Sequence, residues 1–216
     1  MRSNRIIAQS FVWNAAQFIT APVLAVHKYV DEIQLFDGAF RFMKDAGYAS
    51  VPWSTDGTKE VFTALKLECA KKWVPCKDFY KDEIAKKLFM QQRQFWNPGE
   101  WKYILSDDEI PSGDLDATFK QVRASNALVG YIRMWEPQRS KQGVLTLKYL
   151  GWKPRLLRWQ KDLHWKGKHY NLYNAMGIPR DRWPKITLKQ ICLLHLKHIR
   201  PGERLQPQLA YERLNL

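Results

Sequence analysis

Short apolar segments alternate with segments of helical periodicity through the first half of the chain, and this alternation constrains the fold more than any other feature. Strands are expected at residues 5–13, 30–38 and 100–109. Helices are expected to begin near Asn14 and after the STDGT turn at 54–58, and to cover 82–96 and 112–125. Strands that alternate with helices predict an α/β fold with a mostly parallel central sheet and helices on both faces.

The second half of the chain is less regular, but it adds further strands. These are expected at residues 128–137, 154–162 and 186–198, with a C-terminal helix at 201–216. No internal repeat, low-complexity tract or linker divides the sequence. We therefore predict a single domain over residues 1–216, with residues 5–110 and 111–216 as its two halves.

The net charge of +14 indicates a polyanionic partner, because 35 Lys and Arg residues face only 21 Asp and Glu residues. Nucleic acid, an anionic membrane surface and phosphorylated small molecules all fit this charge. The three cysteines have no CxxC spacing, so we expect reduced thiols in a cytoplasmic protein. The most apolar segment, residues 11–26, contains Asn14, Gln17 and Pro22 and lacks the run of about 20 apolar residues that a membrane span needs.

Three consecutive acids follow the expected strand at 100–109, namely Asp107, Asp108 and Glu109. Carboxylates this close repel one another unless a divalent cation offsets their charge, and Mn²⁺ or Mg²⁺ would also bind the oxygens of a diphosphate. The alternative is an acidic loop that stabilises the start of the next helix through its dipole. Asp37 also follows a strand, and carboxyl ends of parallel strands meet at one edge, so we expect these acids to converge on one crevice.

The order of these segments resembles glycosyltransferase family two, whose members have the GT-A fold and use nucleotide-diphospho-sugars. The similar segments are SFVWNAAQFI, VDEIQLFDG, STDGT and QQRQFWNPGEWKYILSDDE, which together span about residues 6–110. Two features depart from the family pattern. Residues 39–53 separate DG from STDGT and are expected to form an inserted surface loop near the donor pocket. Ser106 takes the place of the first Asp in the family's D-x-D-E motif.

The resemblance implies a donor site and a metal site. Asp108 is implied as the metal ligand, and His195 completes the metal shell unless it is a core histidine; His198, three residues on, would point to the opposite face. Asp107 is expected to contact ribose or water. Asp56 lies beside the nucleotide or caps its helix, and Arg93 contacts the base or diphosphate or is a solvated helix residue. The residues implied to bind the donor nucleotide are Val12, Trp13, Asn14, Asp37, Asp56, Arg93 and Asp107.

The implied reaction is metal-dependent transfer of a sugar to a glycan or lipid-linked acceptor, with no nucleic-acid partner and with contact to an anionic membrane as a further option. Residues 153–173 resemble the family's acceptor segment, although Tyr170 replaces its usual Glu. The base that would deprotonate the acceptor is Glu109, Glu136 or Asp162, and the sequence does not choose. The alternatives are a basic nucleic-acid-binding protein or metal-dependent nuclease, and a non-catalytic relative of the fold.

Overall fold

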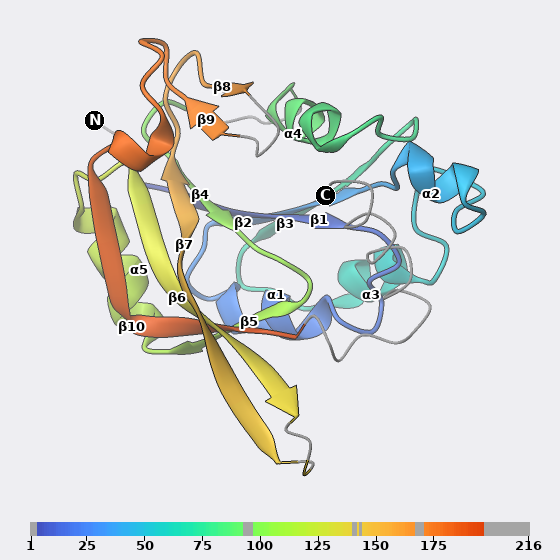
Figure 1. Ribbon diagram of the computed structural model, residues 1–216, viewed down its shortest axis with the longest axis horizontal. Coiled ribbons are helices and arrows are strands. Elements are labelled where there is room, and N and C mark those ends of the chain that lie inside the picture. The colour runs from blue at the N-terminus through green and yellow to red at the C-terminus, as the bar shows by residue number, and fades with distance from the viewer. Residues whose placement is uncertain (1–3, 93–96, 140–141, 143, 167–170, 197–216) are drawn as a thin grey trace.

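An eight-stranded sheet runs through the protein, with helices on both of its sides (Figure 1). The computed structural model describes residues 4–92, 97–139, 142, 144–166 and 171–196. Its strands are β1 (Ile6–Val12), β2 (Glu32–Asp37), β3 (Ala70–Pro75), β4 (Trp101–Ile104), β5 (Glu109–Gly113), β6 (Val129–Arg139), β7 (Leu145–Arg158), β8 (His164–Lys166), β9 (Asn171–Tyr173) and β10 (Lys185–His195). Its helices are α1 (Thr20–Val26), α2 (Arg41–Asp45), α3 (Thr58–Ala64), α4 (Glu83–Gln92), α5 (Leu115–Ala124) and the short 3-10 helix η1 (Arg180–Arg182).

The order of strands in the large sheet is β3-β2-β1-β4-β7-β6-β10-β5. The pairs β2–β3, β1–β2 and β1–β4 are parallel, as is β6–β10. β7 runs antiparallel to both of its neighbours, and β5 runs antiparallel to β10. The prediction of a mixed α/β fold with a mostly parallel sheet is thus confirmed, and the second half of the chain contributes the antiparallel pairs.

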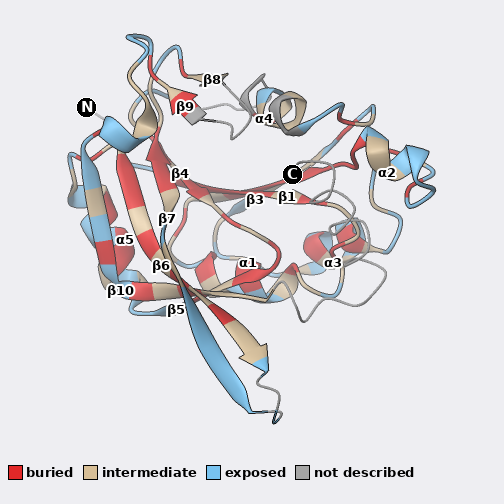
Figure 2. Cartoon of the chain, viewed as in Figure 1, coloured by how far each residue is buried: buried red, intermediate tan, exposed pale blue. Residues whose placement is uncertain are grey.

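The two faces of the sheet are covered by different helices, because side chains alternate along each strand. Ile33 and Leu35 of β2 lie in the main core with the apolar sides of α1, α3 and α5. Phe36 points to the other face, where its ring meets the ring of Phe89 on α4 edge-on at 6.3 Å. Figure 2 shows the buried residues concentrated along the sheet and on the inner sides of these helices. No helix in the described ranges is long and apolar enough to cross a bilayer.

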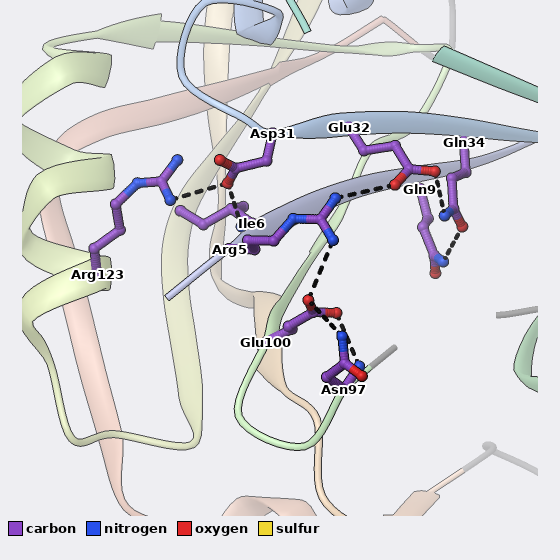
Figure 3. Close-up of polar contacts among 9 residues, drawn as sticks. All are labelled: Arg5, Ile6, Gln9, Asp31, Glu32, Gln34, Asn97, Glu100 and Arg123. Carbon is purple, nitrogen blue, oxygen red and sulfur yellow. Dashed lines mark hydrogen bonds and ion pairs between the residues drawn. The ribbon is translucent and has the colours of Figure 1, made fainter. Parts of the chain in front are cut away.

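Polar contacts tie the amino-terminal ends of the parallel strands together (Figure 3). Arg5 forms ion pairs with Glu32 at 3.3 Å and Glu100 at 3.4 Å, which links β1 to β2 and to the start of β4. Asp31 accepts hydrogen bonds from the backbone N–H of Ile6 at 2.7 Å and from Arg123 of α5 at 2.9 Å. These contacts lie at the edge away from the carboxyl ends of β1, β2 and β4, so we assign them a structural role.

Two helices begin or end elsewhere than the sequence indicates. α1 begins at Thr20 rather than near Asn14, whose backbone has a positive φ of 48° that no helix can contain. The helical spacing of Val61, Phe62, Leu65 and Cys69 predicts a helix that continues to Cys69, but α3 ends at Ala64 and the chain continues into β3. The expected C-terminal helix at 201–216 lies outside the described residues.

Candidate functional site

The acidic residues after β4 form a turn, residues 106–109, that connects two strands of the large sheet. The backbone N–H of Glu109 donates to the carbonyl of Ser106 at 3.4 Å, and Glu109 then begins β5. β5 pairs with β10, and the pairing sets Glu109 opposite His195. The backbone N–H of Leu196 donates to the carbonyl of Asp108 at 2.7 Å, which fixes the end of β10 against the turn. Pro111 and Gly113 are part of β5.

Asp108, Glu109 and His195 together offer three ligand atoms that lie within 4.8 Å of one another. Asp108 Oδ2 is 3.2 Å from His195 Nε2. Two neighbouring ligands of an octahedral ion with bonds of about 2.1 Å lie about 3 Å apart. The separation of Asp108 Oδ2 and His195 Nε2 matches this spacing, and a carboxylate oxygen is a donor that suits Mg²⁺ or Mn²⁺.

His195 lies between two carboxylates. Burial lowers the pKa of His195, but the hydrogen bond and charge of Asp108, with the charges of Glu109 and Glu136, outweigh burial and raise it. His195 Nδ1 is buried and lies 3.4 Å from Glu136 Oε1, within reach of charge attraction but without a hydrogen bond to the described residues. A carboxylate behind the second ring nitrogen is the usual way in which a protein orients a metal-binding histidine.

Glu109 is held by an arginine that the sequence analysis did not identify. Arg155 of β7 donates from Nε to Oε2 of Glu109 at 2.7 Å and from Nη2 to Oε1. Both side chains are largely buried, with 18% and 7% of their surfaces exposed. Burial lowers the pKa of Arg155, but Glu109 outweighs burial and raises it above its usual value. The pair occupies both carboxylate oxygens of Glu109, so this carboxylate is poorly placed to act as a general base.

Ser106, the main departure from the family motif, supports Asp108 directly. Its hydroxyl donates a hydrogen bond to Asp108 Oδ1, which leaves Oδ2 directed at His195. Asp107 is also buried, with 6% of its surface exposed. An acid at position 106 would add negative charge beside Asp108. The Ser106 hydroxyl instead donates a hydrogen bond, which offsets the charge of Asp108.

A second cluster of polar residues lies at the end of β2. Asp37, the last residue of β2, accepts hydrogen bonds from the backbone N–H of Ser54 at 2.9 Å and from the Ser54 hydroxyl. Ser54 Oγ in turn accepts from the backbone N–H of Asn14 at 2.8 Å, and Asn14 Oδ1 accepts from Thr55 N–H at 2.9 Å. Burial raises the pKa of Asp37, although the Ser54 hydrogen bonds oppose this effect. Asp37 therefore joins the STDGT turn to the loop after β1.

Asp56 extends the same network on the other side of the turn. Its Oδ1 accepts from the backbone N–H of Thr58, the first residue of α3, at 3.1 Å, and its Oδ2 accepts from Ala16 N–H at 3.0 Å. The hydroxyl of Thr58 accepts from Ala15 N–H at 2.7 Å. Asp56 thus precedes the N-cap of α3, which is Gly57, and still binds the first N–H of the helix. Val12 is buried beside Asp37 as its pairing partner, and Trp13 is half-buried.

The insertion at residues 39–53 does not separate the two halves of the donor motif in space. The backbone N–H of Ala39 donates to the carbonyl of Pro52 at 2.9 Å, so the insertion closes on itself and returns Ser54 to Asp37. Inside it, Phe40 packs with Tyr80 and Phe11 beneath α2, whereas Trp53 is 45% exposed. A Cβ on Gly38 would lie 2.3 Å from the ring of Tyr80. The space beside Gly38 is therefore filled by packing and is not open to a ligand.

The two clusters lie at the same edge of the sheet. β1, β2 and β4 are parallel, Asp37 pairs with Val12, and Ile104 at the end of β4 pairs with Gln9. β1 separates β2 from β4, and strands lie about 4.8 Å apart, so the two clusters stand roughly 10 Å apart across the sheet. A nucleoside diphosphate is long enough to reach both.

The structure does not bring Asp162 to this edge, which corrects its inclusion among the candidate bases. β7 runs antiparallel to β4 with Arg158 opposite Trp101, so the chain leaves β7 at the opposite edge of the sheet from Asp108. Asp162 lies there in an exposed turn with a positive φ of 60°. Arg93, Tyr170 and His198 lie outside the described residues.

No protein-family model matches the chain, and no curated protein matches it. A crystal structure of residues 1–349 of TarS from S. aureus is similar, with 15% identity, a TM-score of 0.44, and cover of 61% of this chain and 36% of that one. The present chain thus spans little more than a third of that structure. At this TM-score the similarity does not identify a function.

Two further solved structures are similar at comparable distance. A 4-diphosphocytidyl-2C-methyl-D-erythritol synthase from Anaerococcus prevotii has 11% identity, a TM-score of 0.37 and cover of 72% of both chains. A protein from Bacillus anthracis described as a glucose-1-phosphate thymidylyltransferase, in complex with sucrose, has 8% identity, a TM-score of 0.36 and cover of 94% of this chain and 78% of that one. The resemblance to glycosyltransferase family two accordingly rests on the sequence motifs.

Proposed function

We propose that this protein is a metal-dependent glycosyltransferase that moves a sugar from a nucleoside-diphosphate donor to an acceptor hydroxyl. The observation that carries the proposal is the placement of Asp108 and His195, 3.2 Å apart, at the carboxyl edge of parallel strands. In open α/β sheets ligands bind at this edge. The sequence motifs that resemble glycosyltransferase family two favour sugar transfer over other reactions of nucleotides.

The residues divide the work in a way that follows from their contacts. Asp108 and His195 would hold Mn²⁺ or Mg²⁺, and the remaining positions of the ion would be taken by the diphosphate and water, as is usual for these ions. A bound ion would stabilise the negative charge that develops on the departing nucleoside diphosphate. Glu136 Oε1 lies 3.4 Å from Nδ1 of His195, so we assign Glu136 a positioning role through its charge in preference to that of general base. Arg155 neutralises Glu109.

The donor nucleoside is proposed to bind along the loop after β1 and the STDGT turn. The hydrogen bonds of Asp37, Ser54 and Asp56 hold these two backbone segments together. Asp37 would therefore act on the nucleotide by fixing the shape of its pocket as well as through its charge. Asp37→Ala is expected to weaken nucleotide binding even without metal.

The proposal is tested by thermal-shift and calorimetric titration with UDP, GDP, CDP and ADP, each with and without Mn²⁺. A nucleotide at 100 times its Kd stabilises the native state by about 2.7 kcal/mol, which is readily measured. We expect a stabilising nucleotide whose effect requires Mn²⁺, and we expect Asp108→Asn to abolish it. Asp107→Asn is the matched control and is expected to have a smaller effect. If Asp108→Asn binds Mn²⁺ and nucleotide as the wild type does, the metal site is wrong.

Product analysis separates sugar transfer from the alternatives. Release of a nucleoside diphosphate from a nucleotide-sugar, dependent on an acceptor, supports the proposal. Release of pyrophosphate from a nucleoside triphosphate and a sugar phosphate would replace it with nucleotidyl transfer. Binding of nucleotide with no turnover of any donor would favour a non-catalytic relative. Salt-sensitive binding of DNA, with none of nucleotides, would favour the nucleic-acid interpretation.

A further inference from the structure

The hairpin formed by β6 and β7 extends well beyond the rest of the sheet (Figure 1). Its far part, residues 135–152, is here called the hairpin tip. Pairing continues from Trp135 opposite Tyr149 to Arg139 opposite Leu145. Figure 2 shows the β7 side of this part as a continuous exposed surface. Between Pro137 and Tyr149 no described residue belongs to the core, so this part of the sequence is free to serve contact with a partner.

One face of the hairpin tip is apolar. Leu145, Leu147 and Tyr149 alternate along β7 and therefore share a face, and they are 66%, 54% and 45% exposed. Their pairing partners on β6 include Pro137 and Trp135, and the rings of Trp135 and Tyr149 lie 4.9 Å apart. A contiguous row of exposed Leu and aromatic side chains marks a surface that binds something apolar.

The hairpin tip also carries a net positive charge. Residues 135–152 contain three cations and one acid. The cations are Arg139, Lys141 and Lys148, and the acid is Glu136, which is buried and contacts His195. Trp152, near the base of the tip, is 37% exposed and lies under the guanidinium of Arg133 at 5.8 Å. Arg139 pairs with Leu145 and shares the apolar face, whereas Lys148 lies on the opposite face. Apolar and aromatic residues on one face, with cations beside them and on the polar face, are the composition of elements that lie in the interface of an anionic bilayer.

We propose that the hairpin tip docks on an anionic lipid bilayer, with the Leu145–Leu147–Tyr149 face in the headgroup region and the cations on lipid phosphates. The charge favours this occupant over a second copy of the chain, because two such tips would bring six cations together, and their two acids, the Glu136 side chains, are buried beside His195. It favours lipid over nucleic acid as well, since a row of leucines gains nothing from a phosphodiester backbone.

Docking of the hairpin tip would place the candidate metal site close to the lipid surface. Glu136, which contacts His195, is on β6 between Trp135 and Pro137. β6 continues only three residues past Glu136, to Arg139, which is about 10 Å at the rise of a strand. An acceptor hydroxyl at the level of the headgroups would then be within reach of the site. The membrane contact itself does not depend on the transfer reaction.

The test is co-sedimentation of the full chain with vesicles of phosphatidylcholine alone and of phosphatidylcholine with about a third of phosphatidylglycerol. We expect binding to the anionic vesicles only, and a loss of binding at high salt, where the screening length falls from about 10 Å to about 3 Å. Leu145→Ser combined with Leu147→Ser is expected to weaken binding about tenfold or more. Arg139→Gln combined with Lys148→Gln is expected to weaken it about 25-fold, or about fivefold for each cation.

Met176→Ser is the matched control, because Met176 is 77% exposed in a loop far along the chain from the hairpin tip. It is expected to bind vesicles as the wild type does. Circular dichroism should show that all the variants stay folded, since the substituted side chains are exposed. Equal binding of wild type and both double variants, or no binding of the wild type, would overturn the proposal. A wild type that has no affinity for vesicles but forms a dimer, which the double Leu variant abolishes, would also overturn it. Tight binding of DNA with no affinity for vesicles would do the same.

Discussion

Replacing Arg155 by methionine is expected to destabilise the protein by about 3–5 kcal/mol, because it leaves a buried carboxylate without its partner. Glu109 is buried, and both of its oxygens accept hydrogen bonds from Arg155. Small domains unfold with a free energy of about 5–15 kcal/mol, so this one change removes a large share of the stability. With a urea m-value of about 2 kcal/mol/M, the midpoint of unfolding should fall by about 1.5–2.5 M.

A double-mutant cycle with Glu109→Gln isolates the contribution of the ion pair. The single Glu109→Gln change should destabilise by about 1–3 kcal/mol, since the amide still accepts one hydrogen bond from Arg155. The double variant should be clearly more stable than the sum of the single changes predicts, because both charges are removed and no unpaired charge stays buried. Lys120→Met is the control, because the ion pair between Lys120 and Asp116 is exposed and its loss should be too small to measure. A loss below about 1 kcal/mol for Arg155→Met, with additive single effects, would refute the buried pair.

Three further changes test other parts of the structure. Gly38→Ala should destabilise by about 1–3 kcal/mol, because the new methyl group would meet the Tyr80 ring, and Tyr80→Leu in the same background should restore part of the melting temperature. Burial lowers the pKa of Lys102 from 10.5 to about 7, and the charges of Lys87 and Lys86 add to the effect. Between these two pH values Lys102 is therefore neutral in the folded protein and protonated in the unfolded chain. The wild type should therefore gain stability as pH rises from about 7 to 10.5, and Lys102→Met should raise the melting temperature more at pH 7 than near pH 10; an equal rise at both would contradict the shift. Asp162→Asn should leave turnover within about twofold of wild type, because Asn tolerates the positive φ and the turn lies at the other edge of the sheet, and a tenfold loss would return Asp162 to the site.

Most strands that the sequence predicted lie inside the large sheet. The two strands of this sheet that the sequence did not predict, β3 and β5, form its edges. β1 and β2 are buried almost throughout, so their apolar runs are strong local signals. β3 and β5 stand at the two ends of the strand order. β3 is mostly exposed or half-buried, and β5 contains Pro111, which an edge strand tolerates. An edge strand has one neighbour and one open side, so its sequence carries little of the expected pattern.

The candidate site was predictable as far as its residues resemble a known motif. The order of motifs indicated that Asp108 and His195 would meet, and the structure places them together. The role of Arg155 had no local signal, because its contact with Glu109 depends on the register of β7 in the sheet, which residues far away in the sequence set. The contact of Glu136 with His195 had no local signal for the same reason. The pairing of strands that are far apart in the sequence determines which charged side chains meet, and a single sequence does not show which strands pair.

The position of β10 has a consequence for how the chain is made. β5 pairs with no strand other than β10 among the described residues, and β10 is synthesised long after it. At roughly 5–20 residues per second, a ribosome would deliver His195 about 4–16 s after Gly113. During that interval the nascent chain holds an unpaired segment next to three clustered acids, so it is open to chaperones and proteases. A chain released early would carry most of the sheet and yet lack the site, because the acids meet their histidine only when the last strand of the sheet arrives.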